Sequence, residues 1–341
     1  MRLGKVSIVC TILTALLVLA TFVLKLTVSR DRPLLDSALR IADVGDWYAE
    51  GYPEFHWLNN DTLLFFNGDS RSTLSPYILD VSSAVASENL GLKRTMKRSS
   101  TVNNEHVSLD GKWILWNDGP DVVVTTIDGS LRKLYRHAWP SLWLPDSRHW
   151  IQFESTDWPP KDDTIIHDVK SQACDRAVLK PPSGHLETVT GGSLSTCALW
   201  YSIREGGVEE FVRHLTLEEA HLGADGTTRR KVELSLGSST KLYDLSISPV
   251  GDRIAYLSCN ETSSPFSPIV RRFLPAICAP KFSVRLNVCT IDDGKNVCLG
   301  TIPVSADAGK NREISTLAWL PDGKHLSFVC RNTLWRVTVG K

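Results

Sequence analysis

Two short segments of the sequence carry side chains that could bind a partner or a cation. The segment 157–163, DWPPKDD, sets a tryptophan before two prolines and ends in two carboxylates, which could coordinate a cation or belong to a solvated loop. The segment 270–273, VRRF, joins two cations to an aromatic ring inside an insertion at 260–280, where an exposed loop could dock a partner. The candidate partner contacts are Trp158, Asp162, Asp163, Arg271, Arg272 and Phe273.

The residue types needed for catalysis are present, but their spacing matches no catalytic motif. The segment GGSLS (191–195) lacks the second glycine of a nucleophile elbow and falls inside a predicted strand. The histidines are scattered, and His149 and His325 occupy matching positions in two similar segments, which favours a structural role at the start of a strand. Phosphate loops and dinucleotide fingerprints are lacking. We therefore expect no catalytic residue, no metal and no cofactor.

The cysteines suggest two disulfides if the compartment is oxidising. In the segment 288–299, VCTIDDGKNVCL, a two-residue turn at Asp293-Gly294 would place Cys289 opposite Cys298 at a close, non-hydrogen-bonded pair. Cys259 and Cys278 bracket the insertion and could close its base. The alternative is that these residues are thiols buried in a β core.

Residues 6–24, VSIVCTILTALLVLATFVL, contain no charged side chain. As a helix they would span about 29 Å, enough to cross the hydrocarbon core of a bilayer. The sequence thus predicts a cytoplasmic tip at 1–5, a transmembrane signal anchor at 6–28 and an extracytoplasmic remainder. The alternative is a signal peptide cleaved after VLA, residues 18–20, which also exports the rest of the chain.

A recurring pattern organises the rest of the chain. A short apolar strand, a turn rich in Asp, Asn and Gly, and a second strand with large residues recur at 55–67, 106–118, 142–154, 192–204, 245–258 and 317–330. The copy at 192–204 has lost its turn acid. Only 32–44 and 216–222 look helical. Many short strands with such turns predict an all-β fold, and a repeat of this length predicts radial repetition.

Three copies, SLDGKWILW, SPVGDRIAYLS and WLPDGKHLSFV, resemble the WD40-like repeat of TolB-type propellers. The resemblance covers residues 53–341 and implies a β-propeller, best counted as six blades of four-stranded antiparallel sheets. The last repeat supplies about three strands, so we expect a strand from the linker at 29–52, around residues 40–48, to complete the ring. The basic run at 92–100, LKRTMKRSS, is expected in a solvated loop joining two blades, with an anionic ligand as the alternative.

The combined prediction is a membrane-anchored extracytoplasmic propeller that serves as a scaffold for a protein, a peptide or an envelope glycan. Lys plus Arg and Asp plus Glu number 38 each, so the chain has no overall basic footprint for nucleic acid. Two alternatives stay open. One is a propeller enzyme of the lactonase or lyase kind with a site in the central channel, and the other is a sensor module of a larger envelope system.

Overall fold

A computed structural model describes most of the chain after residue 34. The residues that it describes are 35, 37–44, 55–67, 74–99, 103–136, 141–153, 163–171, 174–178, 185–190, 198–205, 214–221, 230–235, 240–262, 281–304 and 314–340.

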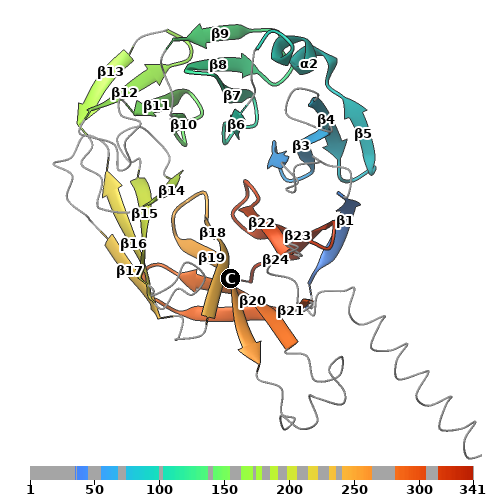
Figure 1. The fold of residues 1–341 in the computed structure, drawn as a ribbon, viewed down its shortest axis with the longest axis vertical. Helices are drawn as coiled ribbons and strands as arrows, with labels where there is room; N and C mark the ends of the chain where they lie inside the picture. Colours follow the sequence, from blue (N-terminus) through green and yellow to red (C-terminus); the bar gives the residue numbers. More distant parts are fainter. Residues whose placement is uncertain are drawn as a thin grey trace, which may run out of the picture.

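The described strands form six four-stranded antiparallel sheets arranged as blades around a central axis, which confirms a six-bladed β-propeller (Figure 1). From inner to outer strand, blades 1 to 3 are β2 (Phe55–Trp57), β3 (Thr62–Asn67), β4 (Ser75–Asp80), β5 (Val85–Glu88); β6 (Asn103–Val107), β7 (Trp113–Asp118), β8 (Asp121–Thr126), β9 (Arg132–Tyr135); and β10 (Ser141–Trp143), β11 (His149–Phe153), β12 (Asp163–Asp168), β13 (Cys174–Val178). Blades 4 and 5 are β14 (His185–Thr190), β15 (Ala198–Glu205), β16 (His214–His221), β17 (Arg230–Ser235); and β18 (Thr240–Ile247), β19 (Arg253–Thr262), β20 (Lys281–Thr290), β21 (Asn296–Val304).

Blade 6 contains both ends of the described chain. Its inner three strands are β22 (Ile314–Trp319), β23 (His325–Cys330) and β24 (Thr333–Thr338), and its outermost strand is β1 (Leu39–Asp43). β1 pairs antiparallel with β24, and Figure 1 shows it in blue beside the red carboxyl-terminal strands. A strand from the amino-terminal segment therefore closes the ring and covers an edge that would otherwise be open.

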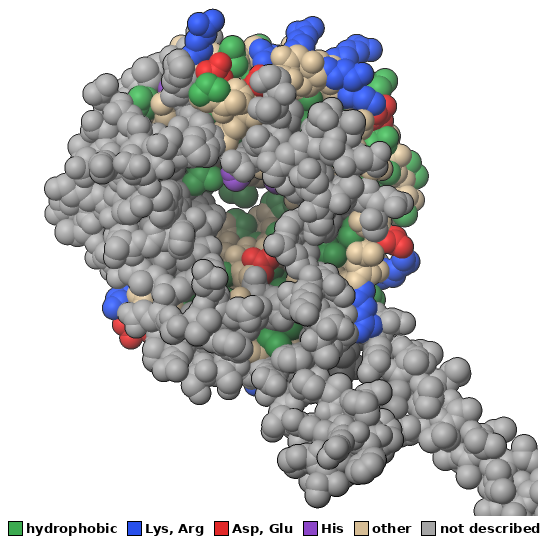
Figure 2. Space-filling model, in the orientation of Figure 1, with side chains coloured by type: hydrophobic (Ala, Val, Ile, Leu, Met, Phe, Trp, Pro, Cys, Tyr) green, Lys and Arg blue, Asp and Glu red, His purple; other side chains and the backbone are tan. Residues whose placement is uncertain are grey.

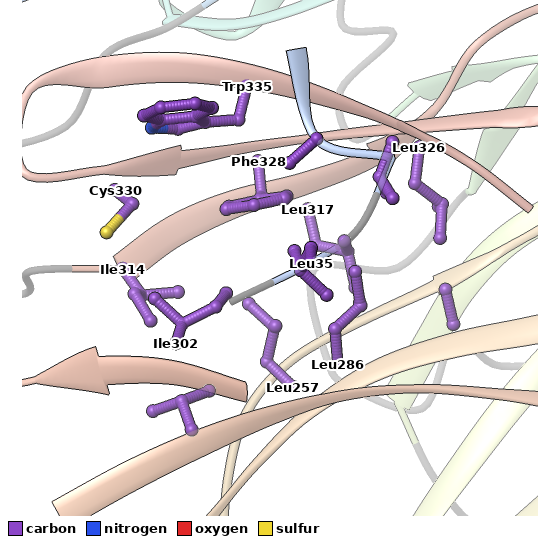
Figure 3. Close-up of a cluster of buried hydrophobic side chains, with 14 of the residues drawn as sticks. Leu35, Leu257, Leu286, Ile302, Ile314, Leu317, Leu326, Phe328, Cys330 and Trp335 are labelled. Atoms are coloured by element: carbon purple, nitrogen blue, oxygen red, sulfur yellow. The ribbon is translucent and has the colours of Figure 1, made fainter. Parts of the chain in front are cut away.

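The hydrophobic core lies between blades. The middle strands β3, β7 and β8 have four consecutive buried residues each, because a neighbouring blade covers each face of the sheet. Each buried cluster draws on two adjacent blades: the largest unites Leu257 and Leu286 of blade 5 with Phe328 and Trp335 of blade 6 (Figure 3). The outermost strands β1 and β5 are largely exposed. A single blade could not bury its own apolar faces, which accounts for the radial repetition.

Both predicted helices are wrong within the described residues. The segment 216–222 lies largely in strand β16, where Leu215 and Leu217 alternate inward and are fully buried. The segment 32–44 contains the closing strand β1. The basic run that we expected in a loop instead contributes to a short helix, α2 (Leu90–Met96), which Asn89 caps by accepting a hydrogen bond from the Leu92 N–H.

The predicted disulfide between Cys289 and Cys298 is also wrong. The two strands are paired two residues out of the expected register, so that Cys289 lies opposite Asn296 and Cys298 opposite Asn287. The turn is longer than predicted because Ile291 is buried against blade 4 and blade 5 residues. The Ile291 N–H donates to the Asp252 carbonyl, which fixes this residue in the turn.

The second predicted disulfide stays a prediction. Cys259 lies buried in β19, whereas Cys278 lies outside the described residues. The predicted anchor at 6–28 lies outside them too, and none of the helices in the described part of the chain is long and apolar enough to cross a membrane.

Two glycines with the same backbone conformation provide a test of inter-blade packing. Gly111 (φ +68°) and Gly119 (φ +64°) are both left-handed, but a Cβ at Gly111 would lie 2.1 Å from the Leu58 carbonyl oxygen of blade 1. A Cβ at Gly119 would have no atom within 4 Å. We expect Gly119→Ala to cost about 1–2 kcal/mol from backbone strain alone, and Gly111→Ala to cost about 2 kcal/mol more. Urea unfolding of both variants measures the difference, and equal losses would show that the blade 1–2 contact is loose.

Candidate functional site

The turns between the first and second strand have one repeated geometry in blades 2, 3, 5 and 6. In blade 3 the Leu144 N–H donates to the His149 carbonyl and the Ser147 N–H to the Leu144 carbonyl. The same two bonds join Leu320, His325 and Gly323 in blade 6. Equivalent pairs of bonds form at Ser108 in blade 2 and at Ser248 in blade 5. The similar segments WLPDSRH (143–149) and WLPDGKH (319–325) therefore form the same turn in blades 3 and 6.

An aspartate locks each of these two turns. Asp146 accepts from the backbone N–H groups of Arg148 and His149, and its second oxygen lies 2.5 Å from His149 Nδ1. In blade 6 the second oxygen of Asp322 lies 2.7 Å from His325 Nδ1. Burial opposes ionisation of both carboxyl groups, but the hydrogen bonds outweigh it and hold each pKa below its usual range. The structural role predicted for His149 and His325 is confirmed.

Contacts between successive turns bring them to one face of the ring. The Asp110 N–H of blade 2 donates to Ser147 Oγ of blade 3, and the Asp322 N–H of blade 6 donates to Asn60 Oδ1 of blade 1. In blade 5, the Arg253 guanidinium donates to the Gly323 carbonyl of blade 6 and lies 5.2 Å from the centre of the Trp319 ring. We call the surface formed by these turns the turn face.

Two strands that leave the turn face end directly before the candidate contact segments in the sequence. β11 and β19 both begin at turns of this face, so their far ends lie at the opposite face, which we call the loop face. The segments 154–162 and 263–280 follow these ends directly. Asp163 is the first residue of β12 and lies beside that end of β11. The other five candidates, Trp158, Asp162, Arg271, Arg272 and Phe273, lie outside the described residues.

Two histidines of the inner strands were not predicted as part of a site. His56 in β2 and His106 in β6 each stand one residue before the end of the inner strand of their blade, and both are half-buried. Leu142, Ser246 and Ala318 occupy the same position in blades 3, 5 and 6. Figure 2 shows a hole through the centre of the ring with histidine side chains at its edge. Aligning FHW (55–57) with EHV (105–107) would have revealed this match from the sequence.

The two imidazoles are neutral at physiological pH. Burial, together with the nearby ring of His106, lowers the pKa of His56 to about 3. Burial lowers the pKa of His106 to about 4. Neutral imidazoles can accept a hydrogen bond or coordinate a metal, so blades 1 and 2 give the channel a polar, uncharged sector. Within the described residues, no group of three or more His, Cys, Asp or Glu side chains is placed to hold a metal ion.

Comparisons with known proteins find only distant similarities. No protein-family model and no curated protein matches the sequence. Among solved structures, a putative TolB from Agrobacterium tumefaciens is 16% identical, with a TM-score of 0.45 and coverage of 85% of this chain and 91% of that one. Hydrazine synthase from Kuenenia stuttgartiensis is 14% identical, with a TM-score of 0.46 and coverage of 85% and 75%.

A third solved structure, an oligogalacturonate lyase in complex with manganese, is 12% identical, with a TM-score of 0.42 and coverage of 90% of this chain and 94% of that one. Identities and TM-scores this low carry no argument about activity. The strand pairing itself establishes that the chain is a six-bladed propeller.

The neutral histidines make stability depend on pH. Their pKa values are lower in the folded state than the ordinary 6.5, so the unfolded chain binds protons first as the pH falls. Stability from this source is present above pH 6.5 and is lost as the pH falls towards 4. Each histidine contributes a slope of up to about 1.4 kcal/mol per pH unit, reduced by solvent in the channel.

We therefore expect the double variant His56→Asn/His106→Asn to show a shallower fall in unfolding free energy between pH 7 and pH 5 than the wild type. Leu142→Asn, at the equivalent position of blade 3, is the control: it changes the stability but not its slope with pH. Urea unfolding across this pH range measures both. An unchanged slope in the double variant would mean that the two rings titrate normally.

Proposed function

We propose that the protein is a membrane-tethered scaffold that binds a protein, a peptide or an envelope glycan at the loop face of its propeller. One observation carries the proposal: the segments 154–162 and 263–280, which the repeats do not account for, follow strand ends on the same face of the ring. One partner bound at the loop face would then reach the predicted contacts of both segments. The uncharged segment 6–24 supports the tether.

The composition of the two segments supports binding as their role. The first offers Trp158 and the carboxylates of Asp162 and Asp163, and the second offers Arg271, Arg272 and Phe273. Tryptophan and arginine are the residues most enriched among energetically dominant interface contacts. Acidic and basic side chains in separate segments would also orient a partner of mixed charge. The turn face, by contrast, is built from the repeated turns themselves.

A second candidate is an enzyme whose site lies in the channel, and the specific observation for it is the pair His56 and His106. Imidazoles held neutral at pH 7 could accept a hydrogen bond from a ligand entering the central hole or coordinate a metal ion that it brings. This candidate predicts that a ligand contacts the inner strands of blades 1 and 2. The scaffold proposal predicts contacts in blades 3 and 5 at the loop face.

Site-specific photo-crosslinking of the full chain in its native cells tests the proposal. A photoreactive residue is introduced in place of Trp158, of Arg272 or, as the control, of Val250, which is 68% exposed on the turn face. We expect a discrete adduct of the same partner from positions 158 and 272 and none from 250, with mass spectrometry identifying the adduct as protein or glycan. A fourth probe replaces His56 in the channel. Equal adducts at positions 158, 272 and 250, or adducts only from position 56, would contradict binding at the loop face.

A further inference from the structure

The outer rim of blades 1 and 2 carries a dense group of cations. Helix α2 with the turn after it contributes Lys93, Arg94, Lys97 and Arg98, and β9 with the residue after it contributes Arg132, Lys133 and Arg136. We call these seven residues the basic rim. Figure 2 shows Lys and Arg side chains gathered along the edge of the ring where Figure 1 places α2 and β9.

Contacts between α2 and blade 2 make this one surface. Asn89 Nδ2 donates to the Ile127 carbonyl at 2.6 Å, and Thr95 Oγ1 donates to the Gly129 carbonyl at 3.3 Å. Both carbonyls lie in the turn that leads from β8 to β9. Leu92 and Met96 anchor the helix in the core between blades 1 and 2, so the cations occupy its outward side.

Only part of this charge is neutralised by the described residues. Lys93 pairs with Glu88, Arg132 lies 3.9 Å from Asp118, and Lys133 donates to the Val169 carbonyl. Within the described part of the chain, the remaining cations have no ion pair with a carboxylate; they are Arg94, Lys97, Arg98 and Arg136, all exposed. An anionic surface would complement these four charges.

Exposed leucines lie among the cations. Leu90 at the start of α2 is 55% exposed, and Leu131 and Leu134 at β9 are 40% and 44% exposed. Side-chain alternation along β9 sets Leu134 on the same side as Arg132 and Arg136. Basic side chains mixed with exposed leucines match a bilayer interface, where apolar groups enter the headgroup boundary and cations meet anionic headgroups. A soluble polyanion would use the cations but not the leucines.

The position of the tether brings this rim within reach of a membrane. β1 is the outermost strand of blade 6, which adjoins blade 1, and Figure 1 shows β1, β5 and α2 following one another along the outer edge of the ring. Leu35 and Ala38 are already buried in the cluster between blades 5 and 6, so ten residues (25–34) separate the apolar segment from the ring. They can span at most about 34 Å, so the edge of the ring beside β1 stays close to any bilayer that holds the segment.

We propose that the basic rim lies on an anionic bilayer surface, with the axis of the ring roughly parallel to the membrane. The orientation rests on the membrane tether of the proposed function, and it leaves both the loop face and the turn face open to partners.

Lysine footprinting of the full chain in nanodiscs tests the orientation. Nanodiscs of phosphatidylcholine alone are compared with nanodiscs containing phosphatidylglycerol, and the acetylation rates of Lys97 on the rim and Lys324 on the turn face are measured by mass spectrometry. We expect Lys97 to react about fivefold more slowly in the anionic discs, the factor expected from one cation held near such a surface. Lys324 should react equally in both, and 1 M salt should abolish the difference.

Matched charge reversals separate the rim from net charge. Arg94→Glu/Arg98→Glu/Arg136→Glu keeps Lys97 as the probe and should remove its protection. Lys112→Glu/Arg285→Glu/Lys295→Glu makes the same change in charge at exposed sites elsewhere and should leave it intact. Equal reactivity of Lys97 in both kinds of disc overturns the proposal. Polyglutamate, a soluble polyanion, is added to the neutral discs as a second test. If it protects Lys97 there, the rim binds anions without a bilayer and the proposal is also overturned. If the chain does not co-elute with any disc, the tether of the proposed function is refuted instead. Binding of the chain to anionic vesicles then tests the basic rim by itself.

Discussion

The ring depends on hydrogen bonds that tryptophan side chains of the inner strands make to the preceding blade. Trp143 Nε1 donates to the His106 carbonyl of blade 2, and Trp319 Nε1 donates to the Ser246 carbonyl of blade 5. Trp57 Nε1 donates to Ser327 Oγ of blade 6 at 2.8 Å, across 270 residues of sequence. Each indole buries a large apolar face between two blades while its one donor is satisfied there. The packing and the spacing of adjacent blades are thus set by the same side chain.

This construction separates the frame from the parts that can vary. The turns, the tryptophans and the inter-blade clusters are occupied in holding neighbouring blades together. The side chains at the channel position, helix α2 and the segments 154–162 and 263–280 are not part of the repeated sequence pattern. Irregular segments mounted on a rigid frame are where propellers and other repeat folds can place binding residues without loss of stability. The loop face, the basic rim and the channel histidines are all additions of this kind.

The sequence could predict the frame because the repeat is local. Asp-Gly and its variants specify the turn, and the large residues around it specify buried strands, so six copies predict six blades. The errors arise where a distant contact decides. The segment 216–222, TLEEAHL, contains good helix formers, but burial of Leu215 and Leu217 against blade 5 makes its described part a strand. The Asp293-Gly294 dipeptide indicates a two-residue turn, yet burial of Ile291 lengthens it and separates the two cysteines.

The candidate site was predictable only in part. The unrepeated segments could be recognised in the sequence, but the strand ends that precede them share one face only because of the direction of β11 and β19. The signals for α2 were present, namely Asn89 before the helix and Leu92 and Met96 four residues apart, although their cationic neighbours suggested a loop. The lowered pKa values of His56 and His106 depend on burial between blades, which no local pattern encodes.

A double-mutant cycle across the closing contact tests this account most directly. Trp57→Phe removes the donor and Ser327→Ala removes the acceptor, and each keeps most of the buried volume. If the inter-blade hydrogen bond holds the ring closed, the unfolding free energies of the two single variants and the double variant should give a coupling energy of about 1 kcal/mol. Strictly additive losses would contradict the account and leave apolar packing alone to close the ring.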